Sequence, residues 1–417
     1  MDSLWIEGGR RLQGEVEVPA SKNASLPLLC LSLLTAKPVR FRNLPGVSDI
    51  QSMRNLLGSL GVQELEPGLF SAEKLTSVKA DYDIVRKMRA SILVLGPLVA
   101  REGRAEVSLP GGCAIGERPV DIHLTGLELL GAKIKLEGGY IFAEAKRLKG
   151  NHLPLHFPTV TGTINLMMAA SLAEGETLIS NAAREPEVVE MAEALRQMGV
   201  TLEGEGTSNI KIQGRSELNG LDWKIQCDRI QLITYLTAAA ITGGDISCRS
   251  YRKGTIDAVV SKLREMGCAV TEIGDQVRVQ SKLPLKPISI ETGPFPEFPT
   301  DAQAQFMACL SLADPAAGLS RMRETIFENR FQHVSELGRM GAQIRLRGNL
   351  ATIRGVPKLS GAAVMASDLR ASASLVLAGL AAEGKTQVLR VYHLDRGYEQ
   401  LEENLNRLGA KVWRAPQ

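Results

Sequence analysis

The residues best suited to chemistry lie in one glycine-rich stretch, SLPGGCAIGERPVD, at residues 108–121. Its three glycines and two prolines exclude a regular helix or strand, so the sequence predicts a loop here. Most unpaired cysteines are buried as small apolar side chains, but a thiol in such a loop is expected to be exposed. A nearby cation lowers the pKa of a thiol and makes it reactive, and Arg118 follows Cys113 by five residues. Cys113 is therefore a candidate for a chemical role, with an inert structural cysteine as the alternative.

A second group of candidates stands directly before segments that are predicted to be buried helices. Lys22 and Asn23 precede one apolar run, and Arg89 precedes a second. Asp368 and Arg370 precede a third. The N-terminus of a helix favours an anion, because its free amide N–H groups point outward. A single arginine before a helix is usually a solvated surface group, but three equivalent cations suggest helix ends that converge on one anion.

The clearest acidic candidate is Asp301, in the stretch PEFPTDAQAQF at residues 296–306. The prolines and the Thr-Asp step place it at the start of a helix. It is either a capping aspartate or a carboxylate with a chemical role. Charges that packing does not explain also occur in FENRF at 327–331, YHLDRGYE at 392–399 and NAAREPEVVE at 181–190.

Composition and charge exclude several classes of protein. The chain has 417 residues, too many for one hydrophobic core, so two domains are expected. A formal net charge of +3, without long runs of lysine or arginine, argues against a nucleic-acid surface. The six cysteines and five histidines show no metal-ligand spacing, so no metal site is expected. No signal peptide begins the chain, and its apolar runs are shorter than the roughly 18 residues of a membrane span. The sequence therefore predicts a cytoplasmic protein that binds neither nucleic acid nor membrane.

The elements that must position these residues are repeated six times. A short phrase such as LRQMGVTL at 195–202 recurs, with its glycines 68 to 74 residues apart. Each phrase is typical of an amphipathic helix that ends at a left-handed glycine and is followed by an alternating strand. Each unit also has a second, apolar helix, which must be buried on nearly every side. The sequence therefore predicts an α/β fold with helices inside, sheets outside and three units per domain; a solenoid is the alternative. The shared glycines are Gly61, Gly131, Gly199, Gly267, Gly341 and Gly409.

The chain resembles the UDP-N-acetylglucosamine 1-carboxyvinyltransferase family, enolpyruvyl transferases of the EPSP synthase superfamily that start bacterial peptidoglycan synthesis. The resemblance runs along the whole chain. It implies two inside-out α/β barrel domains, each of three βαβαββ-type units, joined by a double crossover hinge. The domains would be residues 20–229, with the cysteine loop, and residues 1–19 plus 230–417, with the active site in the cleft between them. The blocks that carry it are SKNA, MRASI, LPGGCAIGERPVD, NAAREPE, FPTDAQAQF, FENRF, SDLRASASLVLAG and YHLDRGYE.

The resemblance also implies a reaction and its residues. The enolpyruvyl group of phosphoenolpyruvate would be added to the 3-hydroxyl of UDP-N-acetylglucosamine, followed by elimination of phosphate, without a metal or organic cofactor. Cys113 would be the general acid and the target of the inhibitor fosfomycin, and Asp301 the base for the sugar hydroxyl. Lys22, Arg118 and Arg396 would clamp phosphoenolpyruvate, and Lys22 and Arg396 count as catalytic with Cys113 and Asp301. The other implied binding residues are Asn23, Arg89, Pro119, Val120, Asp121, Thr159, Val160, Thr161, Ile326, Arg330, Asp368 and Arg370.

Two departures from the family's pattern bear on the acceptor. Phe157 precedes the segment 159–162 where many relatives have a lysine, which affects the grip on the diphosphate. Gln231 and Ile233 replace a glutamate and a glycine. Transfer to another acceptor, such as a free nucleotide, and an inactive paralogue that binds the sugar nucleotide are the alternatives. Shikimate phosphate is disfavoured, because the shikimate enzyme shares the fold but lacks the loop of Cys113.

Overall fold

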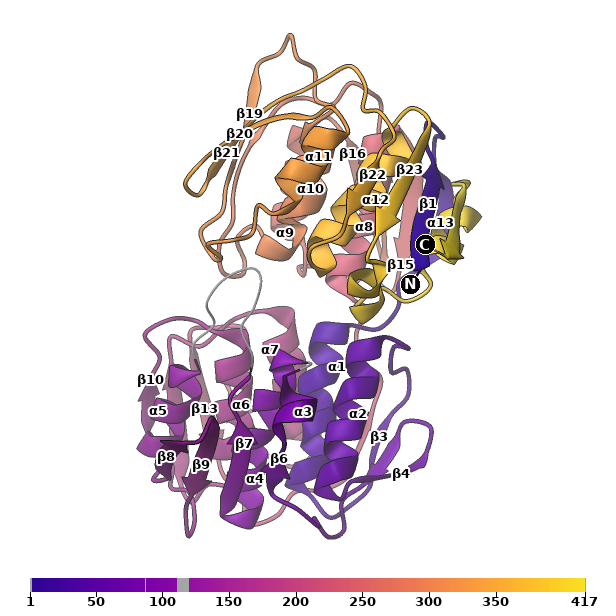
Figure 1. Ribbon diagram of the computed structural model, residues 1–417. Coiled ribbons are helices and arrows are strands. Elements are labelled where there is room, and N and C mark those ends of the chain that lie inside the picture. The colour runs from indigo at the N-terminus through magenta and orange to yellow at the C-terminus, as the bar shows by residue number, and fades with distance from the viewer. Residues whose placement is uncertain (1, 87, 111–119, 417) are drawn as a thin grey trace. The chain divides into compact units, whose positions relative to one another are not determined.

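The computed structural model describes residues 2–86, 88–110 and 120–416 (Figure 1). Cys113, Arg118 and Pro119 therefore lie outside the described residues. The chain divides into two compact units. The described part of unit 1 is residues 2–19 and 227–416, and that of unit 2 is residues 20–86, 88–110 and 120–226.

Unit 2 contains three four-stranded sheets, with strand orders β14-β3-β5-β4, β6-β7-β9-β8 and β10-β11-β13-β12. In each sheet the first two strands are parallel, and the last two form an antiparallel hairpin. The strands are β3 (Val39–Phe41), β4 (Gln63–Glu66), β5 (Leu69–Ser71), β6 (Lys79–Ala80), β7 (Arg104–Ser108), β8 (Lys133–Glu137), β9 (Tyr140–Glu144), β10 (His152–Pro154), β11 (Glu176–Ser180), β12 (Thr201–Glu203), β13 (Asn209–Gln213) and β14 (Leu221–Trp223).

Unit 1 repeats this plan in sheets of order β16-β17-β15-β2, β18-β19-β21-β20 and β22-β23-β1-β24. Strands distant in sequence complete two of them, since β2 pairs in parallel with β15, and β1 pairs with β23 and β24. The strands are β1 (Asp2–Glu7), β2 (Gln13–Glu17), β15 (Asp245–Arg249), β16 (Ala269–Ile273), β17 (Gln276–Gln280), β18 (Ser289–Glu291), β19 (Leu319–Arg323), β20 (Gln343–Arg347), β21 (Leu350–Arg354), β22 (Ala363–Met365), β23 (Lys385–Leu389) and β24 (Val412–Pro416).

Two kinds of helix alternate along the chain. The α-helices are α1 (Lys22–Leu29), α2 (Ser48–Leu60), α3 (Tyr82–Val85), α4 (Leu95–Glu102), α5 (Asp121–Leu129), α6 (Val160–Ala170), α7 (Pro186–Gln197), α8 (Arg229–Thr242), α9 (Asp257–Glu265), α10 (Gln303–Leu310), α11 (His333–Arg339), α12 (Leu369–Ala381) and α13 (Leu401–Arg407). Four 3₁₀ turns accompany them: η1 (Cys30–Leu34), η2 (Arg89–Val94), η3 (Thr300–Ala302) and η4 (Val391–Arg396).

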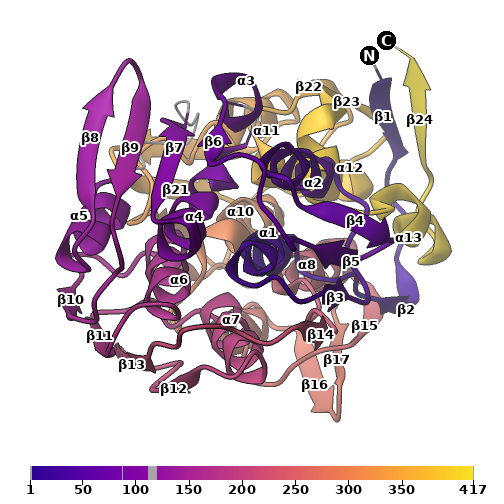
Figure 2. The same ribbon diagram turned by 90° about the horizontal axis from the view of Figure 1, so that it is seen from below.

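The apolar helices are the core of each unit. In unit 1, α8, α10 and α12 pack against one another, and every residue of α10 is buried. In unit 2, α1, η2 and α6 are in mutual contact, and Figures 1 and 2 show sheet β6-β7-β9-β8 outside α4 and α6. The predicted α/β arrangement of inner helices and outer sheets is confirmed. The sheets stay separate at four strands each, so the described residues of neither unit close into a barrel.

The amphipathic helix of each repeat ends as predicted. All six shared glycines have positive φ, between 95° at Gly131 and 104° at Gly61. A side chain is strained in this left-handed conformation, so glycine lets the chain turn from the helix into the following strand. The repeated phrase in the sequence is thus the helix end that starts each outer hairpin.

The chain passes from unit 1 into unit 2 after Pro19 and returns after Gln226. The two segments in which the chain crosses between the units are hydrogen-bonded to each other, once within unit 2 and once within unit 1. The amide of Ser21 donates to the carbonyl of Gln226, and the amide of Asp228 donates to the carbonyl of Pro19, both at 2.8 Å. No helix in the described ranges is long and apolar enough to span a bilayer.

Candidate active site

Asp301 lies at the centre of a buried polar cluster in unit 1. Its Oδ1 accepts a hydrogen bond from Arg330 Nη2 at 2.6 Å, and its Oδ2 accepts one from Arg370 Nη2 at 3.0 Å. The two arginine side chains are only 3% and 5% exposed, whereas that of Asp301 is 26% exposed. No side chain caps η3 or α10 by a hydrogen bond. Asp301 is therefore an ion-pair partner of two arginines rather than a helix cap.

This cluster has more positive than negative charge at its centre. Arg330 Nε and Arg370 Nη1 are buried, and the described residues offer neither of them a hydrogen-bond partner. Burial alone would raise the pKa of Asp301, but the Arg370 and Arg330 guanidiniums hold this pKa well below its usual range. Buried N–H groups without partners are costly, so two guanidiniums around one carboxylate suit an anionic ligand that would complete their hydrogen bonds.

The ends of the core helices position these side chains. Asp368 caps α12, and its carboxylate accepts a hydrogen bond from the amide of Arg370 at 2.8 Å. Asp228 caps α8 in the same way. The Tyr398 ring lies 5.9 Å from the guanidinium carbon of Arg370, and its hydroxyl is 2.8 Å from Thr234 Oγ1. Asp368 was predicted, whereas Tyr398 and Thr234 were not assigned a role, because only the packing of distant helices brings them here.

Glu324 joins the two segments that carry Asp301 and Arg330. It is 2% exposed and accepts hydrogen bonds from Thr300 Oγ1, at 3.0 Å to each carboxylate oxygen. It also accepts from the amides of Ile326 at 2.9 Å and Phe327 at 3.2 Å. Thr300 directly precedes Asp301, and the segment 326–327 leads to Arg330. The carboxylate of Glu324 therefore holds in place both segments that carry the ion pair. No motif in the sequence pointed to Glu324.

Arg396 lies at the end of η4 and interacts with the same region of unit 1. Burial lowers the pKa of His393, and the charge of Arg396 lowers it further, whereas Asp368 acts in the opposite direction. His393 is thus near both Arg396 and the cap of α12. The neighbouring Asp395 has a structural role, since it binds Arg414 of β24 through two hydrogen bonds, at 3.0 and 2.5 Å.

Lys22 is the first residue of α1 in unit 2. Ser21 caps this helix, with its Oγ accepting from the amide of Ala24 at 3.2 Å. Lys22 Nζ lies 2.7 Å from Asp49 Oδ2, and the two side chains are 13% and 5% exposed. This nearly buried ion pair fixes the ammonium group at the helix start, and the half-buried Asn23 follows it.

A neutral network links α4, α5 and α6. His123 Nδ1 lies 2.8 Å from Asn165 Nδ2, and Asn165 Oδ1 accepts from the amide of Gly96 at 2.9 Å. Burial lowers the pKa of His123 to about 4, the charge of Arg89 also lowers it, and that of Asp121 raises it. The predicted Arg89 and Asp121 are therefore neighbours of one buried imidazole. His123 and Asn165 gave no sequence signal, since each lies among apolar residues.

The remaining predicted residues of unit 2 lie at the starts of α5 and α6. Val120 directly precedes α5 and is half-buried. Thr159 caps α6, with Oγ1 3.5 Å from the amide of Gly162. Val160 and Thr161 form the first turn of α6, and Thr161 is exposed. Phe157 is 44% exposed just before this helix.

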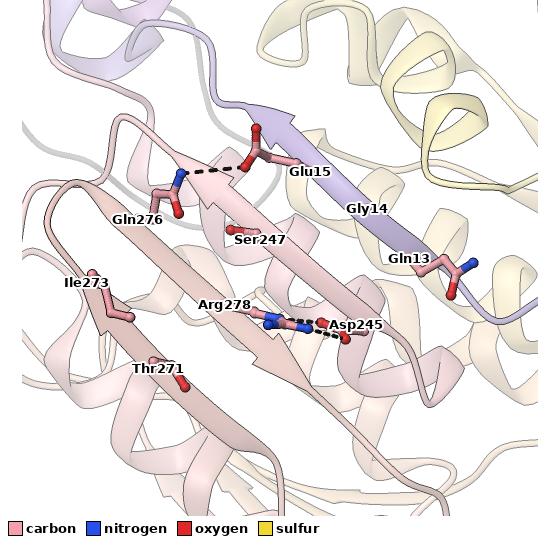
Figure 3. Close-up of a pocket in the computed structure, with 9 residues that line it drawn as sticks. All are labelled: Gln13, Gly14, Glu15, Asp245, Ser247, Thr271, Ile273, Gln276 and Arg278. Carbon is pink, nitrogen blue, oxygen red and sulfur yellow. Dashed lines mark hydrogen bonds and ion pairs between the residues drawn. The ribbon is translucent and has the colours of Figure 1, made fainter.

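A pocket of about 670 Å³ lies on another part of unit 1 (Figure 3). It is on the outward face of sheet β16-β17-β15-β2, and none of the predicted site residues that the structure describes lines it. Its Arg278 is bound by both carboxylate oxygens of Asp245, each at 2.7 Å. Because its charges are already paired, this pocket is not part of the candidate site.

The described cysteines offer no second reactive thiol of the kind predicted for Cys113. Cys30, Cys248, Cys268 and Cys309 are buried and free, and burial raises the pKa of each thiol. Cys227 is half-buried. Within the described ranges, no three histidine, cysteine or acidic side chains are grouped so as to hold a metal ion.

Comparison with known proteins assigns the family. The sequence profile of EPSP synthase (3-phosphoshikimate 1-carboxyvinyltransferase) matches residues 6–405. The fold matches the enolpyruvyl transferase NikO from Streptomyces tendae with a TM-score of 0.88 and 24% sequence identity, over 100% of this chain and 99% of that one. It matches EPSP synthase from Acinetobacter baumannii with a TM-score of 0.77 and 19% identity, over 100% of both chains. The profile covers nearly the whole chain, and this protein belongs to the EPSP synthase family of enolpyruvyl transferases.

Proposed function

We propose that this protein transfers the enolpyruvyl group of phosphoenolpyruvate to the 3-hydroxyl of UDP-N-acetylglucosamine and releases phosphate. The observation that supports an anionic donor most directly is the pair of buried arginines, Arg330 and Arg370, around the single carboxylate of Asp301. A guanidinium binds carboxylate or phosphate through paired N–H groups, and phosphoenolpyruvate carries both anions. The acceptor is inferred from the block LPGGCAIGERPVD, which resembles the corresponding loop of the UDP-N-acetylglucosamine enzymes.

Asp301 is proposed as the base for the acceptor hydroxyl, and the ion pairs decide when it can act. While Arg330 and Arg370 are hydrogen-bonded to Asp301, the low pKa of this carboxylate makes it a weak base. An anion that binds Arg330 and Arg370 withdraws positive charge from the carboxylate, and the pKa of Asp301 rises. The base therefore becomes effective when the donor is in place.

The other steps are assigned to residues in the same proposal. Cys113 protonates the methylene carbon of phosphoenolpyruvate while the acceptor oxygen attacks the adjacent carbon, which gives a tetrahedral intermediate. Loss of a proton from the new methyl group then expels phosphate and restores the double bond. Lys22, Arg118 and Arg396 bind the donor, and the ion pair with Asp49 holds Lys22 in position.

The test is an acceptor panel with phosphoenolpyruvate, read as phosphate release. UDP-N-acetylglucosamine, uridine monophosphate and shikimate 3-phosphate are compared at equal concentration. We expect rapid release with UDP-N-acetylglucosamine, and loss of this activity after fosfomycin modifies Cys113. Release with shikimate 3-phosphate alone, or fosfomycin adducts confined to other cysteines, would contradict the assignment.

Transfer to a free nucleotide is the second candidate. It is favoured by Phe157, which is exposed at the start of α6 and offers no charge for a second phosphate. Faster phosphate release with uridine monophosphate than with the sugar nucleotide would establish it. Binding of the sugar nucleotide without release from any acceptor would indicate an inactive paralogue.

A further inference from the structure

One outward face of unit 1 carries an unusual concentration of arginine. On sheet β18-β19-β21-β20, the side chains of Ser320, Met322, Ala351 and Ile353 point inward and are buried. The alternating residues point outward, and they include five arginines and one glutamate, Glu291. The arginines are exposed and lie on three adjacent strands: Arg321, Arg323, Arg345, Arg347 and Arg354.

Four of these arginines form two rows, one along each neighbour of β21. Arg321 and Arg323 form the row on β19, and Arg345 and Arg347 form the row on β20. Arg321 of β19 and Arg345 of β20 flank Thr352 of the intervening strand β21. Arg323 and Arg347 flank Leu350 of β21 in the same way. Residues two apart in a strand are about 6.8 Å apart, and two strand spacings are about 9.6 Å. The half-buried side chains of β21, Leu350 and Thr352, therefore lie between two parallel rows of guanidiniums.

The arginines of this face are largely unpaired. Arg323 has a carboxylate partner, Glu291, with Nε 3.5 Å from Oε2. For the other four, the described residues supply no ion pair. Five arginines less one glutamate give this face a charge of +4, although the whole chain has a net charge of only +3.

The equivalent face of the preceding repeat shows that the fold does not require this excess. Sheet β16-β17-β15-β2 has the same strand plan, and Figure 3 shows its outward face. There Arg278 is bound by Asp245, and Arg249 lies 2.5 Å from Glu15. Both of these arginines are paired with carboxylates of their own sheet. In the next repeat, most arginines of the equivalent face have no such partner among the described residues and can bind another molecule.

We propose that the arginine face of β19, β20 and β21 binds an extended acidic segment of a partner protein that lies along β21. Side chains of an extended chain alternate in direction, and those on one side repeat at about 6.8 Å, the spacing within each arginine row. Four consecutive aspartates or glutamates would thus give two carboxylates to each row. The guanidinium group suits carboxylates because it can donate two parallel hydrogen bonds.

The composition of the face favours an acidic peptide over other polyanions. Its outward residues include no aromatic side chain. Aromatic side chains are what single-stranded nucleic acids stack on, and tryptophan and tyrosine anchor proteins at membrane interfaces. Each exposed ion pair contributes little and is screened by salt, so the binding is expected to be reversible and salt-dependent.

The test measures binding of a fluorescein-labelled hexaglutamate peptide to the full-length protein by fluorescence anisotropy at low ionic strength. We expect R321T/R345T, which keeps strand-forming residues in both rows, to weaken binding at least tenfold. The matched control is R249T/R278T on the equivalent face of the preceding repeat, which should leave the affinity within twofold. Phosphate release from phosphoenolpyruvate and the midpoint of thermal unfolding, measured for both variants, establish that they are folded.

Two results would overturn the proposal. One is equal hexaglutamate binding by the wild type and R321T/R345T, with both proteins folded. The other is tenfold tighter binding of an unlabelled oligothymidylate, or of phosphatidylglycerol vesicles, through the same two arginines, since either would assign the face to a nucleic acid or a lipid surface. R321K/R345K separates bidentate recognition from charge alone, and we expect it to bind hexaglutamate several-fold more weakly than the wild type.

Discussion

The two units are built from the same repeat, yet different polar groups link their core helices. In unit 1 the core helices enclose a charged cluster, with Arg330 and Arg370 bound to Asp301. In unit 2, α4, α5 and α6 are linked by a neutral network of His123 and Asn165, and the nearly buried ion pair of Lys22 with Asp49 lies at the start of α1. A buried ion pair adds little stability compared with apolar packing, and removing one partner is costly. The repeat can therefore link its core helices through neutral side chains, and the ion pairs of Arg330 and Arg370 in unit 1 suit an anionic ligand.

The largest effect is expected from D301N, which removes the negative charge between the two arginines. We expect kcat to fall on the order of 10³-fold, because the amide cannot take a proton. The affinity for inorganic phosphate should rise, since both guanidiniums lose their competing carboxylate. Steady-state kinetics and calorimetric titration with phosphate measure the two effects. An unchanged kcat, or weaker phosphate binding, would remove the functional difference between the units.

A smaller effect is expected from the neutral network of unit 2 at acidic pH. The pKa of His123 is about 4 in the fold, against 6.5 for an unperturbed histidine. The unfolded chain therefore binds more protons between these values, and stability falls as the pH drops from about 6.5 to 4, by up to about 3 kcal/mol. H123Q should reduce this acid-dependent loss. Urea unfolding at pH 7, 6 and 5 measures it, and an equal slope in both proteins would show that the imidazole is not buried as a neutral group.

The next effect concerns recognition of the donor by unit 1. R370K keeps a positive charge but loses the paired N–H geometry, so we expect phosphoenolpyruvate binding to weaken by about 2 kcal/mol. The affinity for the sugar nucleotide should change much less. Isothermal titration with each ligand separates the two. Equal weakening of both ligands would mean that Arg370 acts by supporting the fold.

The smallest effect is expected from D49N in unit 2, which weakens the ion pair that holds Lys22. The lysine remains, so we expect the KM for phosphoenolpyruvate to rise a few-fold while kcat stays nearly constant. K22A is the comparison, and it should raise KM more. If D49N raised KM more than K22A, Asp49 would itself have to interact with the donor.

The fold was largely predictable because its signals are local. An apolar helix, a terminal glycine and an alternating strand each occupy a short stretch, and their repetition at Gly61, Gly131 and the later positions identified the six units. The separation of the strands into four-stranded sheets was harder to predict from the sequence. Whether strands close into a barrel depends on pairing between repeats, which no short stretch encodes.

The site was predictable only where several charged residues stood together in the sequence. Asp301, Arg330 and Arg370 were each identified, but their pairing joins residues 29 and 69 positions apart. The helix-cap interpretation of Asp301 was equally consistent with its local sequence. Glu324 and Asn165 were missed because Thr300 and Gly96, which they bind, lie 24 and 69 positions away.

The parallel pairing of β2 with β15 affects how the protein is made. All of unit 2 is translated between these two strands, so β2 emerges from the ribosome long before its neighbour. At about 5–20 residues per second, the exposed strand edge waits on the order of ten seconds or longer. Unit 2 is complete by then, whereas unit 1 also needs β1 to pair with the last strand, β24. Unit 1 can finish folding only after β24 has been synthesised, and its early strands need protection from aggregation until then.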